Sequence, residues 1–296
     1  DQLRNASLDR KWLGASGSIS RLIHELQRER GLSSGVIASR GERFGDMLVA
    51  QQKLTDASLG ELQSIVRQHV TDQAIHGGVA AVADRLQGLR QRVSNREISR
   101  DYTVDRYTEL VDALFDMQLS TFGNAVKSSL FRKQMAFVAF SQAKETAGKE
   151  RALLSAILSD HNFSAGRMLI LNNLRATEQA RLVNFTRLAE PDAERLYREI
   201  LQQPDIKEAE RIRQKVKAAA LWEESHGKGS ASTLLAVALP SPEAWFQVAS
   251  IKIDAMKVLE DSLNEAVGIS AEQEESRAWQ ELLLSALLVL LAFVLA

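Results

Sequence analysis

The amino-acid sequence predicts an all-α fold, and three observations support this prediction. All four prolines lie beyond residue 190, which leaves the first 190 residues without the strongest helix breaker. Valine, isoleucine and the aromatic residues do not alternate with polar residues over any long stretch, as half-buried strands would require. Apolar residues recur instead at helical spacing, as they do from Leu48 to Val66 and from Val104 to Met117.

The ends of the expected helices follow from breaks in this periodicity, which separate eight to ten helices. The breaks fall near residues 41–44, 76–78, 94–95, 122–124, 160–164, 190–192, 204–205 and 227–232. The candidate N-caps are Ser164, Asp192, Asp205 and Ser241, the last followed by Pro242 at the first helical position. Beyond Ser241 only Gly268 weakens the pattern, so we expect one helix on the order of 80 Å long.

Composition narrows the class of protein. The chain has 296 residues, of which 45% are hydrophobic and 25% charged, enough for one large globular domain or two moderate ones. Its net charge of −1 gives no reason to expect nucleic acid as a partner. It has no cysteine, which excludes disulfides, thiol catalysis and thiolate metal sites.

The C-terminal residues 282–296 carry no charge, and Trp279 lies just before them. This stretch is shorter than the roughly 20 residues that cross a bilayer, so a buried C-terminal core helix is one interpretation. We favour the beginning of a truncated transmembrane helix at residues 281–296, following a helical sensor domain at residues 1–280. The first residue is Asp1, which indicates a processed or excised piece, and a first membrane span is expected upstream of it.

No catalytic or metal-binding pattern emerges from the sequence. The five histidines are scattered, without a pair at the i, i+3 or i, i+4 spacing of a helical metal site. The sequence contains no phosphate-binding loop, dinucleotide fingerprint or nucleophile elbow. We therefore expect no enzyme activity, no metal and no cofactor.

Two related segments contain the candidate functional residues. The first, Leu22–Ser34, contains Glu29 and Arg30, and a weaker copy around Glu150 and Arg151 indicates two similar helical halves. Adjacent helical residues point about 100° apart, so neither arginine pairs with the glutamate before it. If Glu29 faces solvent, Arg30 can turn inward. A partly buried arginine can bind an oxyanion or be held by a carboxylate of another helix, and both readings stay open.

Several segments resemble the nitrate- and nitrite-sensing (NIT) domain family, in the same order along the chain. They are His24–Gly35, Gln51–Asp56, Ala147–Leu154, Ala244–Phe246 and Ile251–Asp254. The resemblance covers about residues 15–265. The first segment is the most specific, and the later ones are persuasive in combination.

The resemblance implies two packed up-and-down four-helix bundles, with the anion held between helices by arginines. Carried over by position, the leading ligands are Arg30, Arg151 and Lys252, and the secondary candidates are Ser33, Ser34 and Arg28. At Lys252 the family more often has arginine, and lysine lacks the planar fork of a guanidinium. The family serves as an input module of chemoreceptors, histidine kinases and antitermination regulators.

Together these observations lead to a specific hypothesis. The chain is expected to be the extracytoplasmic sensor domain of a receptor in the bacterial inner membrane, binding nitrate or nitrite and signalling through its C-terminal helix. We expect a homodimer, held to the membrane by that helix, with no nucleic acid bound to this portion. The alternatives are a helical sensor for another small anion, such as a carboxylate, and a structural or interaction module whose arginines form internal ion pairs.

Overall fold

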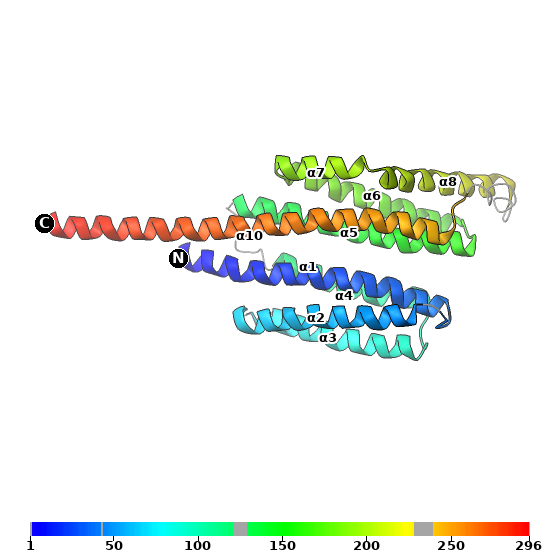
Figure 1. The fold of residues 1–296 in the computed structure, drawn as a ribbon, viewed down its shortest axis with the longest axis horizontal. Helices are drawn as coiled ribbons and strands as arrows, with labels where there is room; N and C mark the ends of the chain where they lie inside the picture. The colour runs from blue at the N-terminus through cyan, green and yellow to red at the C-terminus, as the bar shows by residue number, and fades with distance from the viewer. Residues whose placement is uncertain (1, 43, 71, 121–128, 228–238, 296) are drawn as a thin grey trace. The chain divides into compact units, whose positions relative to one another are not determined.

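The computed structural model describes residues 2–42, 44–70, 72–120, 129–227 and 239–295, and these residues form nine helices and no strand (Figure 1). The helices are α1 (Gln2–Ala38), α2 (Gly45–His69), α3 (Gln73–Ser94), α4 (Arg100–Ser120), α5 (Ser129–Asp160), α6 (Ala165–Leu188), α7 (Pro191–Leu201), α8 (Pro204–His226) and α10 (Pro242–Leu295). The prediction of an all-α fold is confirmed.

The chain divides into two compact units. Unit 1 consists of Asp1–Gln134 and Asn264–Ala296, and unit 2 consists of Met135–Leu263. Unit 1 therefore contains α1 to α4 and the later part of α10. Unit 2 contains most of α5, the helices α6 to α8, and the first part of α10.

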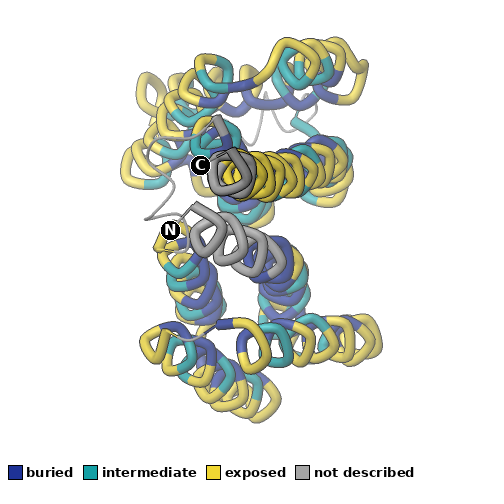
Figure 2. Tube along the Cα trace, turned by 90° about the vertical axis from the view of Figure 1, so that its left-hand side faces the viewer, coloured by how far each residue is buried: buried dark blue, intermediate teal, exposed yellow. Residues whose placement is uncertain are grey.

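Unit 1 is built around α1, which packs against α2 and α4, while α3 completes the bundle against the same two helices. Its core is mainly aliphatic and includes Leu22 and Leu26 of α1, Leu62 of α2, Leu86 of α3 and Leu114 of α4. Such residues recur every three or four positions, so each helix presents one apolar face to the others. Figure 2 shows the buried positions of these helices turned toward one another and the exposed ones turned outward.

The Gly77-Gly78 pair lies inside α3, where the sequence predicted a turn. The helix begins earlier, with the Asp72 carboxylate accepting a hydrogen bond from the Ala74 amide. A Cβ at Gly78 would lie 2.9 Å from the Met117 sulfur of α4. Gly78 therefore allows close packing of two helices and does not form a turn.

Unit 2 has a mixed aliphatic and aromatic core. Leu154 and Ile157 of α5 pack with Ile212 of α8 and Trp245 of α10. A separate aromatic group joins α7 to α5 and α6, with ring centroids 4.8 Å apart for Phe140 and Phe185 and 5.6 Å apart for Phe185 and Tyr197. These groups hold together the helices that carry the polar residues of this unit.

The helices of unit 2 begin near the expected breaks, but not every residue predicted as an N-cap is one. Ser164 precedes α6, and the Ser241 hydroxyl accepts a hydrogen bond from the Ala244 amide at the start of α10. Asp192 and Asp205 are not N-caps, because α7 and α8 begin at the preceding proline. In the first turn their carboxylates instead face the positive end of the helix dipole.

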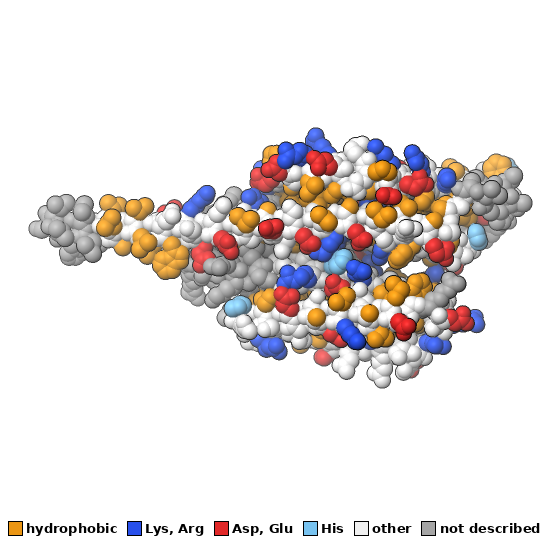
Figure 3. Space-filling view, viewed as in Figure 1, with side chains coloured by type: hydrophobic (Ala, Val, Ile, Leu, Met, Phe, Trp, Pro, Cys, Tyr) orange, Lys and Arg blue, Asp and Glu red, His pale blue; other side chains and the backbone are white. Residues whose placement is uncertain are grey.

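Helix α10 runs unbroken through Gly268, as expected. Near its end Trp279 is half exposed, as are five leucines in residues 282–288, and hydrophobic side chains cover this stretch in Figure 3. A search of the described helices finds none with the length and apolar character to cross a membrane. The predicted transmembrane helix is therefore not supported.

Candidate functional site

The Glu29-Arg30 segment lies inside the buried face of α1. This face includes Leu22, Leu26, Glu29 and Ser33, at steps of four, three and four residues. Glu29 is 0% exposed and Arg30 is 3% exposed, so Arg30 lies inward although Glu29 does not face solvent. Helix α1 contacts both α2 and α4, and its buried face is therefore wide enough to hold two adjacent residues.

Glu29 is held by Arg90 of α3, and we call these residues the unit 1 pair. Arg90 Nε donates to Glu29 Oε1 at 2.7 Å and Arg90 Nη2 donates to Oε2 at 2.8 Å. Arg90 Nη1 also donates to Asp56 of α2 at 2.5 Å. Burial acts to lower the pKa of Arg90, but its hydrogen bonds to Glu29 and Asp56 outweigh burial and raise the pKa. Arg90 therefore stays charged.

Tyr107 of α4 also contacts Glu29. Its hydroxyl donates to Glu29 Oε1 at 2.7 Å and accepts a hydrogen bond from Ser33 Oγ at 3.1 Å. Burial, followed by the negative charge of Glu29, raises the pKa of Tyr107 well above its ordinary value. The phenol therefore remains a neutral donor, and the predicted ligand Ser33 uses its hydroxyl in this contact.

Arg30 turns away from the unit 1 pair toward α4. Its Nη1 donates to Thr108 Oγ1 at 2.9 Å. Arg28 is exposed, and Ser34 is half-buried. Arg30 is therefore buried and Arg28 exposed, as expected for two residues that are two positions apart on one helix and so point in different directions.

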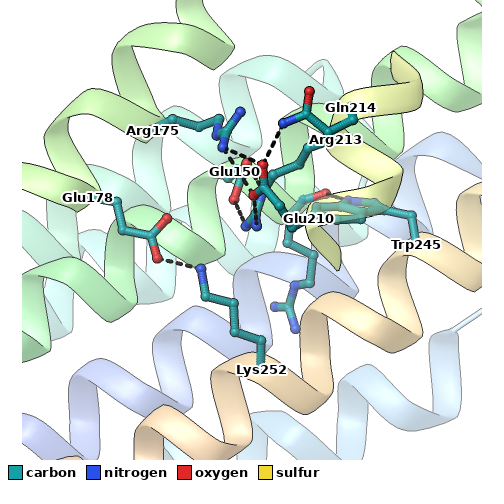
Figure 4. Close-up of polar contacts among 9 residues, drawn as sticks. Glu150, Arg175, Glu178, Glu210, Arg213, Gln214, Trp245 and Lys252 are labelled. Carbon is teal, nitrogen blue, oxygen red and sulfur yellow. Dashed lines mark hydrogen bonds and ion pairs between the residues drawn. The ribbon is translucent and has the colours of Figure 1, made fainter. Parts of the chain in front are cut away.

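Unit 2 contains the same arrangement around Glu150 of α5 and Arg213 of α8, which we call the unit 2 pair (Figure 4). Arg213 Nε donates to Glu150 Oε1 at 2.7 Å and Arg213 Nη2 donates to Oε2 at 2.5 Å. The guanidinium lies 5.7 Å from the centre of the Trp245 ring. Burial acts to lower the pKa of Arg213, but the hydrogen bond and charge of Glu150 outweigh it and raise the pKa.

Arg151 likewise turns toward another helix of its unit, α10. Its Nη1 donates to Ser250 Oγ of α10 at 2.9 Å, and its guanidinium lies 4.6 Å from the centre of the Phe246 ring. Its backbone carbonyl accepts a hydrogen bond from Trp245 Nε1 at 3.0 Å. Both aromatic residues of the segment Ala244–Phe246 therefore contact Arg151.

Lys252 is engaged in an ion pair with Glu178 of α6, and both residues are buried (Figure 4). A cavity of about 470 Å³ lies beside this pair. It is lined by Arg175, Glu178, Tyr197, Glu210 and Arg213, among other residues. Burial and the negative charge of Glu178 raise the pKa of Tyr197 to about 12, so this phenol is neutral as well.

Sequence reasoning missed Arg90 and Arg213, because each lies far along the chain from the Glu-Arg segment that it contacts. Glu29 and Arg90 are 61 residues apart, and Glu150 and Arg213 are 63 apart. Applying either spacing to the other glutamate leads to the exposed Arg92 or Arg211, so spacing alone does not identify these partners. In the described part of the chain, no group of three or more histidine, aspartate or glutamate side chains could hold a metal ion.

Comparison with known proteins gives three findings. A family model described as nitrate and nitrite sensing matches residues 21–268, a range that includes all the candidate residues above. The nitrate regulatory protein of Klebsiella oxytoca is 26% identical over 192 residues, which is 63% of this chain and 48% of that protein. The chain thus spans about half the length of this relative. The solved structure of the NasR transcription antiterminator shares the fold, with a TM-score of 0.74 and 22% identity over 92% of this chain and 71% of that one.

These findings correct the prediction of a receptor. The chain was expected to be an extracytoplasmic sensor of the chemoreceptor or histidine kinase type in the inner membrane. The similar proteins are instead a nitrate regulatory protein and a transcription antiterminator, and no described helix could span a membrane. The expectation that this portion binds no nucleic acid likewise finds no support in these comparisons.

Proposed function

The chain belongs to the nitrate and nitrite sensing (NIT) family, and on this premise we propose that it binds nitrate or nitrite through Arg30 and Arg151 as part of a transcriptional regulator. The observation that carries the proposal is the repeated arrangement of the two units. In each, the arginine that follows a buried, paired glutamate donates to a hydroxyl group on another helix, Thr108 of α4 or Ser250 of α10.

The chemistry of this arrangement suits a planar oxyanion. Nitrate and nitrite present oxygen acceptors in one plane, and a guanidinium presents N–H donors as a planar fork. The Thr108 hydroxyl, which accepts from Arg30, has a proton that can serve as a further donor, whereas the Ser250 hydroxyl donates to the Phe246 carbonyl oxygen. Because the adjacent glutamates are already bonded to other arginines, their oxygens do not compete with an anion for Arg30 or Arg151.

The other predicted ligands have weaker support. An anion at Lys252 would have to displace the Glu178 carboxylate from a buried pair, and separating such a pair is costly. Ser33 is bonded to Tyr107, and Arg28 is exposed. We therefore place Lys252, Ser33, Ser34 and Arg28 behind the two arginines.

Calorimetric titration at constant ionic strength tests the binding proposal. Nitrate and nitrite should give saturable heats and raise the unfolding temperature, whereas acetate and formate should not. Arg30→Gln and Arg151→Gln should each weaken binding at least tenfold, about 1.4 kcal/mol or more, as loss of a charge-assisted contact would. Arg67→Gln and Arg195→Gln, two exposed arginines on α2 and α7, are the matched controls. Tighter binding of a carboxylate, or no response to nitrate and nitrite, would refute the assignment.

A chimera tests the regulatory part of the proposal. Residues 21–268 would replace the matching region of the Klebsiella oxytoca nitrate regulatory protein, and transcription of a reporter would be measured with and without nitrate. Nitrate-dependent output that is lost on Arg151→Gln is the expected result. A folded chimera that binds nitrate but gives constant output would contradict a role in transcription.

A further inference from the structure

Each proposed ligand arginine directly follows a buried glutamate. Glu29 is 0% exposed and Glu150 is 1% exposed, and consecutive Cα atoms lie about 3.8 Å apart. The charge of a buried glutamate acts on the adjacent arginine through a medium that screens it far less than water does. An ionised glutamate without a counter-charge would therefore cancel much of the positive potential that an anion meets at Arg30 or Arg151.

The neighbouring arginine cannot supply that counter-charge. Side chains at i and i+1 of a helix point about 100° apart, and Arg30 and Arg151 donate instead to Thr108 and Ser250. The counter-charge comes from another helix in both units. Arg90 of α3 and Arg213 of α8 each bond both oxygens of their glutamate through Nε and Nη2.

We infer that Arg90 and Arg213 set the anion affinity of Arg30 and Arg151 without contacting the anion. They are positioning residues that neutralise the adjacent glutamates and hold them away from the ligand arginines. The inference rests on the proposed function, and it adds residues from two further helices to the determinants of affinity.

The two units are not equally dependent on their positioning residue. Glu29 also accepts a hydrogen bond from Tyr107, whereas Arg213 alone donates to the Glu150 carboxylate among the contacts of the described residues. A tyrosine hydroxyl stabilises a carboxylate without removing its charge. Loss of Arg213 should therefore reduce nitrate affinity at least as much as loss of Arg90.

Three variants of the unit 2 pair test the inference, with nitrate affinity measured by calorimetry on protein shown to be folded by circular dichroism. Arg213→Gln leaves Glu150 charged and should weaken nitrate binding at least tenfold. The double variant Glu150→Gln/Arg213→Gln removes both charges and should bind within threefold of the parent. Glu150→Gln alone should bind as tightly as the parent or more tightly. Arg195→Gln is the control for loss of a positive charge at a distance.

A purely structural role gives a different pattern. It predicts that folded Arg213→Gln binds like the parent, or that the double variant stays as weak as the single one, and either result would overturn the inference. If Arg213→Gln does not fold, the double variant tests the inference by itself. Parent-like nitrate affinity of the double variant supports neutralisation of Glu150 by Arg213, and a tenfold weaker affinity refutes it. A parent that binds no nitrate refutes the proposed function, whereas a binding parent with the wrong variant pattern refutes the inference alone.

Discussion

The two Glu-Arg pairs have the same central geometry but different surroundings. In unit 1 the Arg90 side chain is 19% exposed, and Tyr107 adds a donor to Glu29. In unit 2 the Arg213 side chain is 8% exposed and lies against the Trp245 ring. The comparison shows that the bidentate contact is the common feature, while the groups around it differ between the halves.

A second difference lies in the contacts that α4 makes in unit 1 and α10 makes in unit 2. In unit 1, the Gln118 amide of α4 donates to the Ser16 hydroxyl of α1 at 3.1 Å, a neutral contact. In unit 2, Lys144 Nζ of α5 lies 2.6 Å from Glu260 Oε2 of α10, and both side chains are buried. Unit 2 therefore depends more on buried charges than unit 1, because removing either partner of a buried ion pair leaves an uncompensated charge.

The largest expected effect comes from breaking the unit 2 pair. Arg213→Ala leaves the buried Glu150 without its partner and should lower the free energy of unfolding by about 3–5 kcal/mol. Arg90→Ala should cost about 1 kcal/mol less, because Tyr107 still donates to Glu29. Urea denaturation measures both. Equal losses would show that Tyr107 does not compensate for Arg90.

The Lys144–Glu260 pair gives the next largest effect. Glu260→Leu leaves a fully buried ammonium and should cost about 3 kcal/mol, whereas Lys144→Met/Glu260→Leu should return to within about 1 kcal/mol of the parent. Gln118→Leu, the matched change in unit 1, should cost about 1 kcal/mol. Equilibrium unfolding compares the three. A double variant as unstable as the single one would show that this pair contributes more than charge compensation.

The sequence predicts the helices of both units better than their polar partners. Apolar periodicity identifies the buried face that holds Arg30, because spacing along one helix is a local property. The same local reasoning does not predict the role of Arg90. Arg90 and Arg92 lie in the same polar stretch, yet Arg92 is exposed and Arg90 reaches Glu29 on α1. Only the packing of α3 against its neighbours separates the two, and no local pattern encodes it.

The consecutive glycines Gly77 and Gly78 show a related limit of prediction from the sequence. Two glycines in succession indicate a turn when only the local chain is considered. In the fold, the absence of a side chain at Gly78 makes room for Met117. In a sequence, a glycine that makes room for a side chain of another helix therefore looks the same as a glycine that a turn requires.

The smallest expected effect concerns Glu210, which bonds Arg213 on the side away from Glu150. Burial acts to raise the pKa of Glu210, but the hydrogen bond from Gln214 and the charges of Arg175 and Arg213 outweigh it and lower the pKa below 4.5. A carboxylate whose pKa is lowered on folding stabilises the protein above its unfolded pKa and loses that contribution as the pH falls through the folded value. Glu210→Gln should therefore make the unfolding temperature fall less steeply below about pH 4.5. Gln214→Ala should give a weaker change of the same kind, because it removes only one of the groups that lower this pKa. Parallel curves for the parent and Glu210→Gln would show that Glu210 does not contribute to the acid sensitivity of unit 2.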